Sequence, residues 1–393
     1  MTTDTSVKFL HSAMTGAPSL TGTNGGAALI GLLDACLVNG FGSGTVDSVV
    51  IASGIATVTR STGHPFEVGS VATIAGATVT GGSINGEQKV LSATTTTYTF
   101  DATGISNQTA SGTITHKLAP LGWTSIGSGS IKAYKSSDVA STGCYLRVDD
   151  SGTTTANYAR VVGYEAMSDV NTGTGPFPTA AQMSGGLYWP KSSAVDATSR
   201  PWILAGDGRM FYLMVAYSTN TSTSFAACNV FGDFISNKSP DAYGCLINGF
   251  NNSTFGTNGA NAGIDYDHGD TGNAATALYI ARSYTGLGSA TVARKAFPIL
   301  LGGNSVRSGA SGLPFPNYSD GGLYVAQHYV AENVTLVYRG LSPGLFCSQQ
   351  NVGNAVFSNR DSITGVTGLS GKTLKAVNSN SGVFFIDTTG PWR

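Results

Sequence analysis

The chain has 393 residues, of which only 11% are charged and 53 are glycine, and its formal net charge is −1. Basic residues are scattered, which argues against partners such as nucleic acid or an anionic membrane, because both need clustered Lys and Arg. Scarce Lys and Glu with abundant Thr, Val, Gly and aromatic residues predict strands and tight turns, and hence an all-β fold. A surface so poor in charge favours burial in an oligomer.

The cysteines and the N-terminus bear on where the chain folds. Cys36, Cys144, Cys228, Cys245 and Cys347 are dispersed and match no metal-ligand spacing, which predicts free, buried thiols and a reducing cytoplasm. The opening MTTDTSVKF lacks the basic and apolar regions of a signal peptide, and no apolar run is as long as a membrane span. We therefore expect synthesis in the cytoplasm and no membrane insertion.

Residues 1–44 are predicted to form an N-terminal arm followed by a helix. The run Ala27 to Val38, AALIGLLDACLV, is strongly helical and is followed by a stop signal at Asn39-Gly40. Its apolar residues cover most of the helix circumference, so the helix should be buried. It would be covered either by its own domain or by a partner subunit.

Residues 45–118 have a different sequence pattern from the segments on either side. Short apolar runs alternate with Gly-rich turns at roughly ten-residue spacing, which is typical of a small β-sandwich or barrel. Large apolar residues are few, so the core of this inserted module should be thin.

Residues 119–393 are predicted to form the main domain, centred on the hairpin PWILAGDGRMFYLMVAY at 201–217. Asp207-Gly208 between two apolar runs indicates a type I′ turn, whose central residues need φ > 0. The second arm is apolar on both faces, which places it inside a double-layered, jelly-roll-like β-sandwich. Strands are predicted at 131–135, 143–149, 158–165, 186–190, 201–206, 209–217, 226–235, 243–248, 277–283, 296–301, 322–330, 333–339, 344–348, 355–358, 374–378 and 382–387.

Two long connections, 168–200 and 250–274, interrupt the strands of this domain. Loops of this length are usually functional surfaces or are ordered by a neighbour. The second contains Asp265, Asp267, His268 and Asp270, whose oxygen ligands would suit Ca²⁺. The spacing does not match an EF-hand, and Asp and Gly also form turns, so the three aspartates are weak candidates and no metal is predicted.

Catalytic motifs are absent from the sequence. Neither GxSxG nor HExxH occurs, and the histidines share no motif. Glu165 and Glu332, the glutamates of the main domain, lie in different predicted strands, so their geometry leaves a paired-carboxylate site open. Nothing else in the sequence supports such a site. We expect no enzyme activity, no catalytic residue and no cofactor.

Aromatic residues in or beside the long loops suggest a binding surface. With Asn and Asp nearby they would suit a glycan, while the alternative is that they pin the loops to the sandwich or fill a subunit interface. These residues are Tyr188, Trp189, Phe250, Phe255, Tyr266, Phe315 and Tyr318, with His268 in the same loop as Tyr266.

Several phrases resemble virion structural proteins of tailed bacteriophages, associated with the tail or neck. They are SVKFLHSAMTGAPSLTGTNGGAALIGLLDACLVNGFG, YLRVDDSGTTTANYARVVGYEAMSDVNTGTGPFP and RPWILAGDGRMFYLMV. The resemblance implies a non-enzymatic, oligomeric tail protein of the baseplate, tail tip or neck, assembled in the host cytoplasm and located in the virion. Its partners would be copies of itself and other virion proteins, contacted through the N-terminal arm and the loops. The alternatives are a receptor-binding fibre or spike module that recognises host surface glycan, and a capsid decoration protein.

Overall fold

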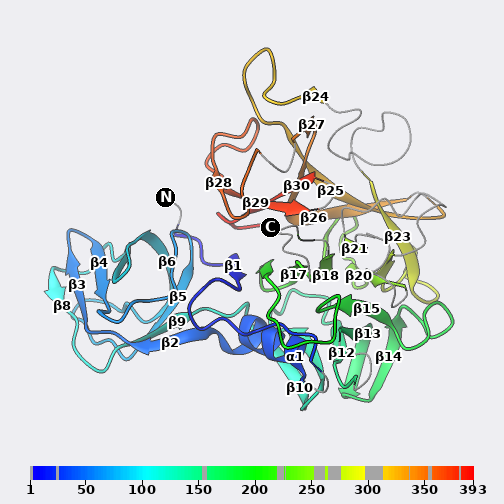
Figure 1. Cartoon of the computed structure of the whole chain (residues 1–393), viewed down its shortest axis with the longest axis horizontal. Helices are drawn as coiled ribbons and strands as arrows, with labels where there is room; N and C mark the ends of the chain where they lie inside the picture. Colours follow the sequence, from blue (N-terminus) through cyan, green and yellow to red (C-terminus); the bar gives the residue numbers. More distant parts are fainter. Residues whose placement is uncertain are drawn as a thin grey trace.

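The computed structural model describes residues 3–23, 26–152, 157–218, 225, 227–251, 262–263, 276–296, 313–335, 337–352, 356–379 and 382–393. These residues form antiparallel sheets almost throughout, which confirms the all-β sandwich expectation. Figure 1 shows a small lobe made by the inserted module and a larger body that holds the other strands.

The predicted helix is confirmed as α1 (Ala28–Leu33) continued by the π-helical turn η1 (Asp34–Asn39). Gly40 follows with φ 73°, a positive value that glycine adopts at low cost, so the predicted stop is also confirmed. The apolar side chains of both segments are buried in the chain's own core. No partner subunit is needed to cover the helix.

The N-terminal segment belongs to the body. Strand β1 (Lys8–His11) pairs antiparallel with β16 (Trp202–Gly206), in register from Lys8↔Gly206 to His11↔Ile203. Phe9 and Leu10 enter cores on opposite sides of this sheet. Residues 8–11 therefore contribute a strand and two buried apolar side chains to the chain's own body.

The module is an eight-stranded sheet in the order β2-β9-β5-β6-β7-β4-β3-β8. It begins at Phe41, slightly before the predicted boundary, because β2 pairs with β9 from Phe41↔Leu118. Strand β6 pairs with both β5 and β7 and shifts register between Val90 and Ser92, which lets one sheet curl around a small core. The strands are β2 (Phe41–Thr45), β3 (Ser48–Ala52), β4 (Ile55–Thr59), β5 (Val71–Ala75), β6 (Gly86–Ala93), β7 (Thr97–Asp101), β8 (Gln108–Thr109) and β9 (Thr115–Leu118).

The body is built around the hairpin of β16 and β17 (Met210–Val215), which lies between two cores. Along β17, Met210, Tyr212 and Met214 enter one core, and Phe211, Leu213 and Val215 enter the other. Because strand side chains alternate between faces, an all-apolar strand must be covered on both sides. The hairpin is thus the middle of three layers, one more than the predicted double layer. The same layer contains β18 (Ala227–Asp233), β20 (Cys245–Phe250), β21 (Ala262–Gly263) and β22 (Thr276–Ile280).

Two outer layers cover the hairpin, one below and one above it in Figure 1. The lower one combines α1 and η1 with β10 (Trp123–Ser128), β11 (Ile131–Ser136), β12 (Tyr145–Asp149), β13 (Tyr158–Asp169), β14 (Thr172–Phe177) and β15 (Leu187–Pro190). The upper one contains β19 (Ile235–Ser236), β23 (Thr291–Ala296), β25 (Val325–Glu332), β26 (Tyr338–Ser348), β28 (Ser362–Ile363), β29 (Leu374–Ser379) and β30 (Gly382–Asp387), with the short pair β24 (Leu313–Pro314) and β27 (Gln350–Asn351) beside it.

The hairpin turn differs from the predicted type I′. Neither Asp207 nor Gly208 has a positive φ. Instead, the Asp207 Oδ1 accepts the backbone N–H groups of Arg209 and Met210, both at 2.8 Å, and the Asp207 N–H donates to the Met210 carbonyl at 2.9 Å. Hydrogen bonds to the Asp207 side chain thus stabilise this turn, in place of the positive-φ backbone conformation of a type I′ turn.

Candidate functional site

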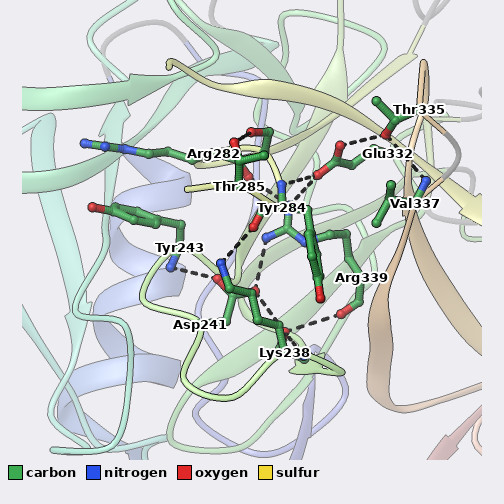
Figure 2. A network of polar contacts seen from close by, with 12 residues as sticks. Lys238, Asp241, Tyr243, Arg282, Tyr284, Thr285, Glu332, Thr335, Val337 and Arg339 are labelled. Atoms are coloured by element: carbon green, nitrogen blue, oxygen red, sulfur yellow. Dashed lines mark hydrogen bonds and ion pairs between the residues drawn. The ribbon is translucent and has the colours of Figure 1, made fainter. Parts of the chain in front are cut away.

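A buried polar cluster of the body is centred on Arg339, at the start of β26. Its side chain is fully buried, and Figure 2 shows it between the loop after β19 and two hairpins. One terminal nitrogen donates to Glu332 Oε1 and to the Arg282 carbonyl, each at 2.9 Å, and the other donates to Asp241 Oδ2 at 3.1 Å. Arg339 therefore connects three chain segments.

The carboxylates of this network are occupied by donors. Glu332 Oε1 also accepts the backbone N–H of Tyr284, and its Oε2 accepts the Thr335 hydroxyl at 2.8 Å. Asp241 Oδ2 accepts the Ser236 hydroxyl at 2.8 Å. A general acid or base needs a carboxylate oxygen within reach of a substrate proton. The network instead has the properties of a clamp, because separating a buried charge from its partner is strongly unfavourable.

The second glutamate of the body joins the same network. Both oxygens of Glu165, on β13, accept from the Arg282 guanidinium, at 2.5 and 2.6 Å, and this contact raises the pKa of Arg282. The guanidinium also lies 4.2 Å from the ring centre of Tyr243, a cation–π contact. The two glutamates left open as a catalytic pair are thus each paired with a different arginine.

Above the clamp, two hairpin tips expose apolar side chains. The tip between β22 and β23 carries Leu287, which is 75% exposed, and the tip between β25 and β26 carries Val334, which is 88% exposed. The Asn333 N–H donates to the Val292 carbonyl at 2.9 Å, so the tips are adjacent. We call the exposed residues of this region the hairpin-tip patch: Tyr284, Leu287, Val292, Val334 and Tyr338.

The aromatic residues predicted to bind glycan are placed differently from one another. Trp189 and Phe250 are fully buried, and the Trp189 Nε1 donates to the Asn248 carbonyl at 2.7 Å. They are not available to stack on a glycan, which corrects that expectation. The strand expected at 186–190 forms as β15, and Trp189 is buried because alternate side chains of this strand face the core.

Tyr188 is half-buried, with the Arg160 guanidinium 3.9 Å from its ring centre and the Tyr158 ring edge-on at 4.7 Å. Phe315 packs against Phe357, and Tyr318 is 91% exposed.

The other predicted site residues lie outside the described residues: Phe255, Asp265, Tyr266, Asp267, His268 and Asp270. In the part of the chain that the structure describes, no group of three or more His, Cys, Asp or Glu side chains could hold a metal ion.

Sequence reasoning missed Arg339, Asp241 and Arg282. One sequence feature could have indicated Arg339: charges are rare in this chain, and Arg339 follows the apolar run VTLVY. A charge buried beside such a run needs polar or charged partners.

No helix of the described residues is long and apolar enough to cross a membrane. The chain matches no protein-family model, and no curated protein is similar to it in sequence.

Proposed function

We propose that this chain is a non-enzymatic structural protein of a tailed-bacteriophage virion, an oligomeric tail component of the baseplate, tail tip or neck. One observation carries the proposal: the carboxylates of the buried Arg339 network are held in internal ion pairs, while the tips above it expose apolar side chains. The sequence resemblance and the low charge support it.

The physical argument joins the clamp to the hairpin-tip patch. Arg339 fixes the bases of both hairpins, so their tips are presented with little conformational freedom. Exposed apolar groups that cluster on a rigid surface usually mark a protein contact. Tyr284 and Tyr338 add the aromatic side chains that are enriched at interfaces. The partners would be copies of this chain and other virion proteins.

Imaging of an intact particle at side-chain resolution tests the proposal. The expected result is several copies of the chain around the tail axis, with the hairpin-tip patch covered. Light scattering of the purified chain should show self-association at high concentration. A stable monomer that is missing from the particle would contradict the proposal, and copies on the capsid shell would assign it to decoration instead.

Receptor binding is a second candidate, favoured by the loop at 315–322. Tyr318 is almost fully exposed there, beside Asn317 and Asp320, and such a combination suits stacking and hydrogen bonding to a sugar. Particles that carry Tyr318→Ala should then assemble normally but adsorb poorly to the host. Normal adsorption would remove this loop from consideration.

A further inference from the structure

We infer that Lys191 and Asp150 become joined by an amide bond between the lysine Nζ and the aspartate Cγ, forming a cross-link inside the folded chain. The lysine side chain is 1% exposed and the aspartate side chain is 0% exposed, and Nζ donates to Oδ1. The other lysine–carboxylate pairs of the described residues each have at least one partner in contact with solvent.

The sheet holds the two reacting groups together. Asp150 directly follows β12 and Lys191 directly follows β15, and both strands pair with β13, through Asp149↔Arg160 and Tyr158↔Pro190. The Lys191 backbone N–H also donates to the Asn157 carbonyl at 2.8 Å. Groups fixed in this way react as if at very high concentration, because the entropy of bringing them together was lost on folding.

Burial of the site disfavours a charged carboxylate. Burial raises the pKa of the Asp150 carboxyl, although Lys191 and backbone N–H groups oppose that effect. An ammonium has three N–H donors, and among the described residues Nζ has one acceptor. Transfer of one proton from Nζ to Oδ1 gives a neutral amine beside a neutral carboxylic acid and removes both buried charges.

The remaining steps need no added reagent. The amine lone pair attacks Cγ, and the negative charge develops on Oδ2, which already accepts the Leu29 N–H at 2.8 Å. A second proton then passes from nitrogen to Oδ1, the Cγ–Oδ1 bond breaks, and water leaves. In the product, Oδ2 is an amide oxygen that still accepts from Leu29, and the nitrogen keeps one N–H.

Mass spectrometry of the full-length protein under denaturing conditions tests this inference. The wild-type mass should be lower than the sequence mass by one water molecule. Trypsin should fail to cut after Lys191, and fragmentation should join the peptide that contains Asp150 to the one that contains Lys191. Lys191→Arg should restore the full sequence mass. Lys132→Arg, which alters a partly exposed lysine 2.7 Å from Asp34, should keep the deficit.

A wild-type mass equal to the sequence mass would overturn the inference. So would a deficit that survives Lys191→Arg, as a cyclised Asp207-Gly208 pair would produce. If Lys191→Arg does not fold, the wild-type mass and its fragmentation still decide the question. The test does not depend on the proposed virion role.

Discussion

Arg339 and Glu332 form an ion pair at 2.9 Å in which the arginine side chain is 0% exposed and the glutamate side chain 5%. The pair joins the two strands that border the exposed hairpin tip at Val334. Asp241 forms a second ion pair with the same arginine, at 3.1 Å. One cation therefore neutralises two buried carboxylates.

Arg339→Met should destabilise the body strongly, because both carboxylates would lose their cation inside the protein. We expect a loss of about 3–5 kcal/mol in the free energy of unfolding, measured by urea denaturation. The matched control is Arg209→Met, since Arg209 pairs with Asp138 at 2.6 Å with both side chains partly exposed. The control should lose about 1 kcal/mol or less. Equal losses in the two variants would show that the Arg339 network is not a clamp.

Leu213→Asp should prevent folding, because it places a carboxylate in the middle layer of the body. Leu213 is fully buried within an apolar cluster of the described residues, where a carboxylate would be desolvated. Val139→Asp is the control, since Val139 is fully exposed, and it should change stability by about 0.5 kcal/mol or less. Circular dichroism and solubility report the outcome. A folded Leu213→Asp protein would show that the core is misplaced.

Two substitutions of Asp207 should separate the contribution of its charge from that of its hydrogen bonds in the hairpin turn. Asp207→Asn keeps the oxygen that accepts the Arg209 and Met210 N–H groups but loses the charge 2.9 Å from Arg393, and should lose about 1 kcal/mol. Asp207→Ala loses both and should cost about 1–2 kcal/mol more. Equal unfolding free energies for the two variants would assign no role to the turn hydrogen bonds.

The module should lose stability in mild acid. Burial lowers the pKa of His116 to about 4 from an ordinary value of 6.5, so the folded ring stays neutral while the unfolded chain takes up a proton. Stability from this group is complete above about pH 6.5 and is lost as the pH falls toward about 4. Burial also lowers the pKa of His64 in the same module.

Thermal melting of the wild type and of His116→Gln across this pH range checks the prediction. The variant should show a shallower fall in melting temperature, with His64 and the Glu67 carboxylate, whose pKa is also lowered, contributing to what remains. Identical slopes would mean that His116 does not drive the effect.

The hairpin-tip patch should control self-association without affecting folding. Leu287→Ser combined with Val334→Ser removes two exposed apolar side chains, so the molar mass measured by light scattering at high concentration should fall while the melting temperature stays the same. Val139→Ser, equally exposed but outside the patch, should leave the molar mass unchanged. A double variant that still associates like the wild type would exclude the patch as the contact.

Local sequence patterns predicted most of the strands, because the alternation of apolar and polar residues and the turn residues that bound a strand are visible within a few positions. The runs at 202–206, 210–215 and 382–387 were expected almost as they occur. β1, β10 and β14 were missed, since Lys8–His11 is short and the other two are rich in Gly, Ser and Thr. The strand expected at 355–358 does not form over its described residues, 356–358, and most of 296–301 lies outside the described residues.

The candidate site could not be predicted because it depends on long-range register. Arg339 and Asp241 are 98 positions apart, and Arg282 and Glu165 are 117 apart. No local pattern specifies such pairs. The strand at 186–190 was expected, but the burial of Trp189 follows from the pairing of β15 with β13, which no local pattern specifies.

The way in which the module leaves and rejoins the body makes it a replaceable cassette. Its first and last strands are neighbours, with Phe41 opposite Leu118, and the Leu121 N–H donates to the Cys36 carbonyl at 2.9 Å on the body side. A short linker across this gap would therefore restore a continuous body, and an unrelated domain with adjacent ends would fit in the same place. An exchange would have to replace the contacts that Glu67, Glu87 and Lys89 of the module make with His11, Lys8 and the Thr388 carbonyl of the body. Sequence variation between related chains should therefore be concentrated on the parts of the module away from these three residues.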